Sequence, residues 1–323
     1  MGTSDRILVA GAGGFIGGWL VRDLVNKGHS NVIAVDVKPI SDWYQVFQSA
    51  ENCVVDLRQY GNCIEVMNGV KVVYNLAADM GGMGFIENNK ALCMLSVLIN
   101  TNLIEIARLN SVQRYFYASS ACVYRQGMQL ESHNLGLKES DAYPADPEDG
   151  YGWEKLFSER MCNHYFEDFG MQVRVARFHN VYGPNGTFDG GREKAPAAIC
   201  RKIAKAVISK DYRIDIWGDG EQTRSFTYID DTLKGIDLLM ASDFHLPLNI
   251  GSSEDVSINQ LVDIVEEIAG IKVERNYLLD APKGVRGRNS DNTLIRELFN
   301  WAPNVSLKQG LTETYKWIYQ ELV

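Results

Sequence analysis

The chain has 323 residues, of which 46% are hydrophobic and 23% charged, a profile typical of a soluble globular protein with a large core. Its formal net charge of −9 argues against non-specific nucleic-acid binding, because phosphate backbones are held through an excess of Lys and Arg. Any phosphorylated ligand must therefore be held by a local group of cations.

The N-terminal residues and the cysteines indicate a cellular setting. The first apolar run, 7–10, is too short for a signal peptide, and we find no stretch that approaches the length of a transmembrane helix. We therefore expect a cytoplasmic protein with no membrane partner. The six cysteines are scattered without CxxC pairing, which favours buried thiols over a disulfide framework or a zinc site, so no metal is expected.

Short β-branched runs alternate with longer amphipathic stretches along the first half of the chain. The expected order is strand 7–10, helix 15–27, strand 32–35, helix 59–68, strand 72–76, helix 90–109, strand 114–118, helix 151–168 and strand 172–177. This order predicts an α/β fold with a Rossmann doubly wound parallel sheet and crossover helices.

The spacing becomes irregular near residue 180. Turn-rich segments then follow at 183–186, 190–191 and 217–220, as is typical of loops that line a ligand cleft. We expect a Rossmann domain over 1–179 and a smaller C-terminal α/β substrate domain over 180–323. Within a return segment of about 226–250, residues 247–250 are predicted to form a strand that rejoins the first domain.

A glycine-rich loop with the spacing GxxGxxG joins the first strand to the first helix. Gly11 would make the tight turn, and Gly17 would let helix and strand pack closely. Gly14 would let a pyrophosphate approach the backbone amides at the start of the helix, at Phe15 and Ile16, where the helix dipole favours negative charge. Position alone leaves a purely structural turn open.

Asp36, at the end of the second strand, favours the cofactor interpretation of this loop. A carboxylate there can accept hydrogen bonds from the adenosine ribose hydroxyls, which favours NAD over NADP. A turn-capping role for Asp36 is the alternative. The combination of loop and carboxylate predicts a dinucleotide site.

Tyr151 and Lys155 lie four positions apart and hence on one helical face. A free phenol has a pKa of roughly 10, so taking a proton from a sugar hydroxyl at neutral pH requires a nearby cation. Lys155 would supply that cation and hold the nicotinamide ribose, and Ser120, at the end of a preceding strand, would hydrogen-bond the reacting hydroxyl. The alternative for the Tyr-Lys pair is a chance surface pair.

Six long strings carry a more specific resemblance. They are LAADMGGMGF at 76–85, SSACVY at 119–124, RFHNVYG at 177–183, GGREKAPAA at 190–198, WGDGEQTRSF at 217–226 and GVRGRNSDN at 284–292. On these strings the chain resembles the extended short-chain dehydrogenase/reductases, and within them the GDP-mannose 3,5-epimerases. The resemblance implies an isomerase with bound NAD, a GDP-mannose substrate and a homodimer formed through the helices at 90–109 and 151–168. It also places Asp56, Leu57 and Ala77 beside the cofactor.

The same resemblance implies a redox-neutral cycle in which C4 of the sugar is oxidised, C3 and C5 are inverted, and hydride then returns to C4. Cys122 would be the general base and Lys194 the general acid on the opposite ring face. The related 4,6-dehydratases carry an Asp-Glu pair where this chain has Ala121-Cys122. For Cys122 the alternative is an ordinary buried thiol, and for Lys194 a solvated loop lysine.

From the same resemblance, we expect seven further positions to contact the substrate. They are Gly81 and Met83 near the sugar, Asn180 and Lys202 on the pyrophosphate side, and Gln222, Arg224 and Arg286 in the second domain. The cations make physical sense, because Arg and Lys neutralise a diphosphate.

Two alternative functions stay open at this point. One is a 4-epimerase, a decarboxylase or another NAD-dependent enzyme that acts on a related nucleotide sugar. The other is a non-catalytic NAD-binding regulator, which would have no physical need for Ser120, Tyr151 and Lys155 together.

Overall fold

The computed structural model describes residues 2–133, 135–282 and 284–323. Its centre is a seven-stranded parallel sheet in the order β11-β6-β5-β4-β1-β2-β3. The strands are β1 (Ile7–Ala10), β2 (Val32–Asp36), β3 (Glu51–Val54), β4 (Val72–Asn75), β5 (Arg114–Ser120), β6 (Val173–Phe178) and β11 (Pro247–Ile250). The α/β Rossmann prediction is therefore confirmed, and strand 247–250 rejoins the sheet beside β6 as expected.

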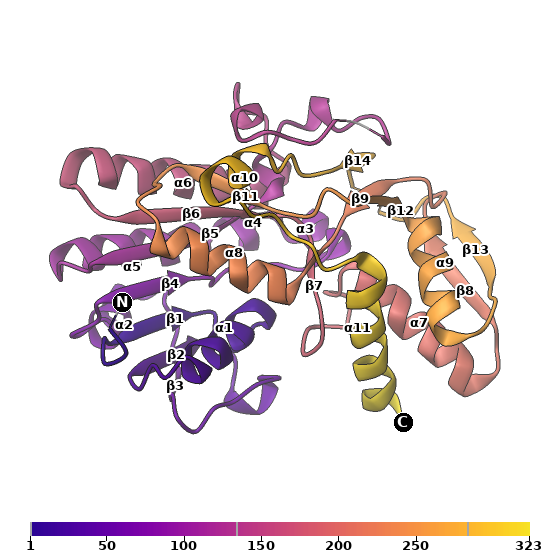
Figure 1. Ribbon diagram of the computed structural model, residues 1–323, viewed down its shortest axis with the longest axis horizontal. Helices are drawn as coiled ribbons and strands as arrows, with labels where there is room; N and C mark the ends of the chain where they lie inside the picture. The colour runs from indigo at the N-terminus through magenta and orange to yellow at the C-terminus, as the bar shows by residue number, and fades with distance from the viewer. Residues whose placement is uncertain (1, 134, 283) are drawn as a thin grey trace.

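Helices cover both faces of this sheet (Figure 1). On one face lie α1 (Phe15–Asn26), α8 (Ile229–Ala241) and α10 (Thr293–Phe299), and on the other α2 (Tyr60–Val66), α5 (Val97–Leu109) and α6 (Asp149–Phe169). The short helices α3 (Met83–Asn88) and α4 (Lys90–Met94) pack against α6. Alternate residues of β1 point into two separate cores: Ile7 and Val9 pack with α1 and α8, whereas Leu8 and Ala10 pack with α2, α5 and α6. Burial on both faces explains why the strands read as continuous apolar runs.

The expected elements differ from the structure mainly at their ends. The helix expected at 90–109 divides into α4 and α5, and β5 extends two residues further than expected, so that it ends on Ser120. The edge strand β3 was not predicted, because its partly exposed and polar residues form no apolar run. Short 3-10 helices follow at Ile40–Asp42, Ala121–Val123, Gln126–Met128 and Glu139–Ala142.

The prediction that no segment approaches the length of a transmembrane helix is wrong for one helical stretch. The segment Lys90–Leu109 has 20 residues and is apolar enough by length and composition alone. One such helix is weak evidence for a span, because a core helix of a folded domain has the same composition. Here Leu103, Ile104 and Ala107 of α5 are fully buried in the core beneath the sheet.

The remaining elements gather beyond one end of the sheet, at the right of Figure 1. The helices are α7 (Ala195–Ser209), α9 (Ile258–Ala269) and α11 (Leu307–Leu322), and the longer strands β8 (Arg213–Trp217) and β13 (Glu274–Leu278) pair in parallel. The short strands β7 (Val181–Tyr182), β9 (Thr223–Ser225), β10 (Thr227–Tyr228), β12 (Asp255–Ser257) and β14 (Gly287–Arg288) form two further small sheets, in the orders β10-β7 and β12-β9-β14.

Candidate active site

A cavity of about 660 Å³ lies where β5 and β6 end and the C-terminal elements begin. Ser120, Cys122 and Tyr151 line it from the Rossmann side, and Lys194 lines it from the start of α7. Ligands of open α/β sheets commonly bind at this carboxyl edge of the strands. The structure therefore brings four of the five predicted catalytic side chains to one cavity.

Lys155, the fifth, lies behind Tyr151 and does not line the cavity. Both side chains are buried on α6, and Lys155 Nζ is 5.5 Å from the centre of the Tyr151 ring. Burial, followed by the charges of Cys122 and Glu154, raises the pKa of Tyr151 well above its ordinary value, and the Ser120 hydroxyl acts in the opposite direction. A phenol in this setting can act as a base only with help from a nearby cation.

Cys122 sits in the short 3-10 helix directly after β5, where its backbone N–H donates to Ser120 Oγ at 3.2 Å. Its thiol is buried, and burial raises its pKa, while the positive charge of Arg288 lowers it. Nη1 of Arg288 donates to Cys122 Sγ at 3.4 Å, which favours the thiolate form. The thiol is thus held beside a cation at the cavity wall.

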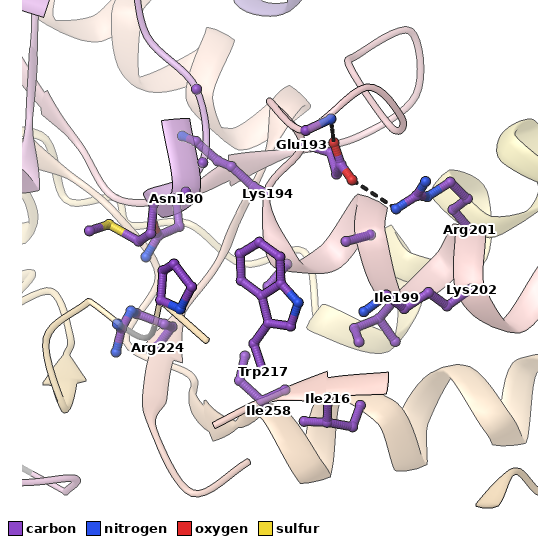
Figure 2. Close-up of a pocket in the computed structure, with 18 of the residues that line it drawn as sticks. Asn180, Glu193, Lys194, Ile199, Arg201, Lys202, Ile216, Trp217, Arg224 and Ile258 are labelled. Carbon is purple, nitrogen blue, oxygen red and sulfur yellow. Dashed lines mark hydrogen bonds and ion pairs between the residues drawn. The ribbon is translucent and has the colours of Figure 1, made fainter. Parts of the chain in front are cut away.

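Lys194 caps the N-terminal end of α7 and is half-buried. Burial lowers its pKa, Cys122 raises it, and Arg288 lowers it further. Figure 2 shows its side chain extending into the pocket on the side of Asn180, while Arg201 and Lys202 lie at the other end beyond Trp217. A lysine whose proton is easier to release suits a general acid.

Six of the seven predicted substrate contacts line the same cavity: Gly81, Met83, Asn180, Lys202, Gln222 and Arg224. Several are fixed by the protein itself, since Asn180 Nδ2 donates to the Ser225 carbonyl at 3.0 Å and Lys202 Nζ to the Asp215 carbonyl at 2.6 Å. Burial, followed by the charge of Arg288, lowers the pKa of Arg224 to about 10. The cavity therefore concentrates cations in a chain that is acidic overall.

Arg286 is the exception among these seven. Its guanidinium pairs with the carboxylate of Asp219 at 2.8 Å, and it is not among the cavity-lining residues. Arg288, two positions later, takes the place facing the cavity and donates to Gln129 Oε1 at 2.6 Å and Glu148 Oε2 at 2.7 Å. Arg288 was not predicted as a site residue, although Arg288 lies in the string at 284–292. The strand β14 decides which of the two arginines points into the cavity, and the sequence does not show that orientation.

The dinucleotide loop has the close contacts that its glycines predict. Gly11 has a φ of +83°, a conformation favouring glycine, and a side chain there would meet the backbone of Ala77. A Cβ on Gly17 would lie 2.1 Å from the Gly11 carbonyl oxygen. The loop can therefore form only with glycine at both positions, and it leads into the first turn of α1, where the amides of Phe15 and Ile16 have no intrahelical acceptor.

The predicted adenosine contacts lie at and just after the ends of the neighbouring strands β2 and β3. Asp36 ends β2, where its Oδ1 accepts from the backbone N–H of Lys38 at 3.0 Å. Asp56 accepts from Arg58, and Leu57 is buried against the sheet. The glycine cradle, the helix start and the carboxylate at the end of β2 together fit an NAD molecule.

Comparison with known proteins connects this geometry to a family. Residues 7–251 match the NAD-dependent epimerase/dehydratase family. The chain belongs to that family. It is 52% identical over 318 residues to GDP-mannose 3,5-epimerase 1 of Oryza sativa subsp. japonica, covering 98% of this chain and 82% of the relative. It is also 51% identical to GDP-mannose 3,5-epimerase of Arabidopsis thaliana, covering 98% and 83%.

Solved structures have the same fold. The UDP-glucose 4-epimerase of Thermotoga maritima has a TM-score of 0.88 at 24% identity, covering 98% of this chain and 100% of that one. The UDP-glucuronic acid 4-epimerase of Bacillus cereus, in complex with UDP-glucuronic acid and NAD, has a TM-score of 0.83 at 25% identity, covering 98% and 99%. This member of the epimerase/dehydratase family is therefore an NAD-dependent nucleotide-sugar epimerase.

Proposed function

We propose that this chain inverts C3 and/or C5 of GDP-mannose through a transient 4-keto sugar. The observation that carries the proposal is the placing of Cys122 and Lys194 in one cavity with Tyr151. Interconversion at C4 alone needs no carbon acid or base, whereas inversion of a neighbouring carbon needs both. The names and identities of the two plant relatives support the same substrate.

Each side chain has a role in this proposal that follows from its position. Bound NAD supplies the acceptor and later the donor of the C4 hydride. Tyr151, with Lys155 behind it, takes the proton of the C4 hydroxyl, and Ser120 orients that hydroxyl. Once C4 is a ketone, the hydrogens on C3 and C5 become acidic.

Inversion then requires a proton to leave one ring face and another to arrive at the opposite face. Cys122 removes the carbon-bound proton: a C–H bond breaks and an S–H bond forms. Lys194 returns a proton from its ammonium group, which is easier to deprotonate than an ordinary lysine. The raised pKa of Cys122 makes its thiolate a stronger base, and the lowered pKa of Lys194 makes its ammonium a stronger acid.

The test is incubation with GDP-mannose in deuterated water, with NMR of the recovered sugar. We expect deuterium at C3 and/or C5 and a GDP-galactose-type product. We expect Cys122→Ala to abolish exchange while bound NAD is retained, and Ser209→Ala, at the far end of the same cavity, to preserve it. A wild-type enzyme that returns unlabelled sugar contradicts the proposal.

A related nucleotide sugar as substrate is the second candidate, since the solved structures include epimerases that act on UDP-linked sugars. A parallel assay with GDP-, UDP-, ADP- and dTDP-linked sugars separates the two, because only the true substrate gives rapid label uptake. A non-catalytic NAD-binding regulator would label none of them.

We also propose that the chain forms a homodimer through α4, α5 and α6. Trp153 and Phe157 of α6 are 48% and 52% exposed, and they lie one helical turn apart on one face. The neighbouring helices expose Leu92, Met94, Leu95 and Leu98. An apolar face of this extent is typical of a surface that a second subunit covers.

A further inference from the structure

A buried carboxylate, that of Glu154, lies directly beside Tyr151 and Lys155 and has no part in the chemistry described so far. Glu154 precedes Lys155 on α6, and its side chain is 1% exposed. Buried carboxylates are rare unless they are paired, because burial of a charge is costly. Its partners therefore indicate what it does.

Glu154, Lys155 and Tyr117 form a closed group inside the protein. Lys155 Nζ lies 3.5 Å from Glu154 Oε2 and donates to Tyr117 Oη at 3.2 Å. Tyr117 Oη in turn donates to Glu154 Oε1 at 3.0 Å. The ammonium is thus tied to the carboxylate twice, once directly and once through the phenol of Tyr117.

This geometry accounts for the donors of Lys155. An ammonium has three N–H donors, and one of them is used in the hydrogen bond to Tyr117 Oη, while Glu154 Oε2 lies at ion-pair distance. Donors therefore remain for the side facing Tyr151, whose ring centre is 5.5 Å from Nζ, and for the cofactor ribose. A buried lysine without a counter-ion would lose its charge more readily, because burial disfavours the charged form.

We propose that Glu154 is a positioning residue that keeps Lys155 charged and aimed at Tyr151. Glu154 does not line the cavity, so it acts through Lys155 and not on the substrate. The inference rests on the roles proposed above for Tyr151 and Lys155. The inference adds a counter-ion, Glu154, that allows the buried Lys155 side chain to stay charged beside Tyr151.

The surroundings of the group offer Lys155 no other carboxylate within ion-pair distance among the described residues. The titratable and polar groups that face it are Tyr117 from β5, Tyr151, Ser158 and Cys162 from α6, and Cys93 from α4. Burial first, and then the charge of Glu154, raises the pKa of Tyr117 well above its ordinary value, so this phenol stays neutral and can bridge the pair.

The decisive variant is Glu154→Gln, which keeps the shape of the side chain and removes its charge. The first readout is the protonation state of Lys155, followed by NMR of enzyme labelled with ¹³C at the lysine ε-carbon. The Lys155 signal is assigned by its absence from Lys155→Met. We expect the ε-carbon signal of Lys155 in Glu154→Gln to lie nearer to that of a neutral amine than the wild-type signal does at the same pH.

The second readout is reduction of bound NAD by substrate, followed by nicotinamide absorbance across pH. We expect Glu154→Gln to be about tenfold slower or more at neutral pH, with its alkaline fall moved to lower pH. In Glu154→Asp, which keeps the negative charge, the alkaline fall in rate should lie between those of Glu154→Gln and the wild type. Ser158→Ala is the matched control, because Ser158 Oγ donates to the same Glu154 Oε1 at 3.1 Å but carries no charge, and it should leave the fall in place.

The outcomes are separable. If Glu154→Gln matches the wild type in both the lysine signal and the pH profile, the inference is overturned. If Tyr151→Phe and Lys155→Met still reduce bound NAD, the proposed function itself fails. Should Glu154→Gln not fold, Glu154→Asp and Tyr117→Phe decide, since each is expected to shift the lysine signal in the same direction by a smaller amount, and no shift in either overturns the inference.

Discussion

Arg192 and Asp79 join the two loops that form the sugar end of the cavity. Nη1 of Arg192 donates to Asp79 Oδ1 at 2.7 Å, and its guanidinium stacks 3.7 Å from the centre of the Phe85 ring. The backbone carbonyl of Arg192 also accepts from the N–H of Gly82 at 3.0 Å. The segment carrying Gly81 and the segment carrying Lys194 are therefore held as one unit.

From this link we expect Arg192→Ala to slow deuterium exchange by about tenfold, because small displacements of a catalytic group are costly in rate. Stability should change by less than about 1 kcal/mol, since exposed ion pairs contribute little. Exchange kinetics and urea unfolding measure the two quantities. A variant with wild-type kinetics would show that the loops hold their places independently.

Lys194 gives a prediction about pH. Burial lowers its pKa below the ordinary 10.5, and an acid must be protonated to act. Exchange should therefore fall on the alkaline side at a pH below that of a free lysine. In Lys194→Arg, whose guanidinium stays charged, the alkaline fall should move to higher pH in whatever activity remains. Persistence of the same fall in the arginine variant would assign it to another group.

The buried pair of Glu159 and Arg177 gives a prediction about stability. The side chains are each 2% exposed, and Arg177 Nη2 donates to Glu159 Oε2 at 2.7 Å. Glu159→Ala leaves an uncompensated buried charge, so we expect a loss of about 3–5 kcal/mol in the free energy of unfolding. Glu105→Ala, at a half-exposed pair with Arg108, should cost less than about 1 kcal/mol. Comparable losses in the two variants would refute this distinction.

Gly17→Ala tests the dinucleotide loop. A Cβ would lie 2.1 Å from the Gly11 carbonyl oxygen, so the loop must shift, at a cost of about 1–3 kcal/mol. We expect purified Gly17→Ala to retain far less NAD, as measured by absorbance after denaturation. Gly61→Ala in α2 meets nothing within 4 Å and should keep the full complement. Full NAD occupancy in Gly17→Ala would mean that the cofactor does not depend on this close approach.

The proposed dimer face gives the last prediction. Phe157→Glu places a charge among exposed apolar side chains of α4, α5 and α6, so a dimer formed there should dissociate. Light scattering or analytical ultracentrifugation should report a dimer for the wild type and a monomer for this variant. Leu135→Glu, at a position that is 92% exposed in the loop whose Leu137 hydrogen-bonds with Asn289 and Asp291, should stay dimeric. A dimeric Phe157→Glu would move the interface elsewhere.

The sequence by itself determined the parallel sheet, because strands buried on both faces leave apolar runs that alternate with amphipathic helices. It also indicated the dinucleotide loop, since the spacing of Gly11, Gly14 and Gly17 is a local requirement of one turn. Tyr151 and Lys155 could be paired for the same reason, because helical periodicity alone sets their separation. These features depend on neighbours along the chain.

Only the tertiary structure decided which distant residues meet. Sequence strings could not tell that Arg288 faces Cys122 while Arg286 turns to Asp219, because the strand β14 and its pairing with β9 set that orientation. Nor could they show that Glu154 lies inside the protein on the far side of Lys155, since its burial comes from the packing of α6 on β5. Charges in a low-dielectric interior act through space, and the folded chain alone fixes those distances.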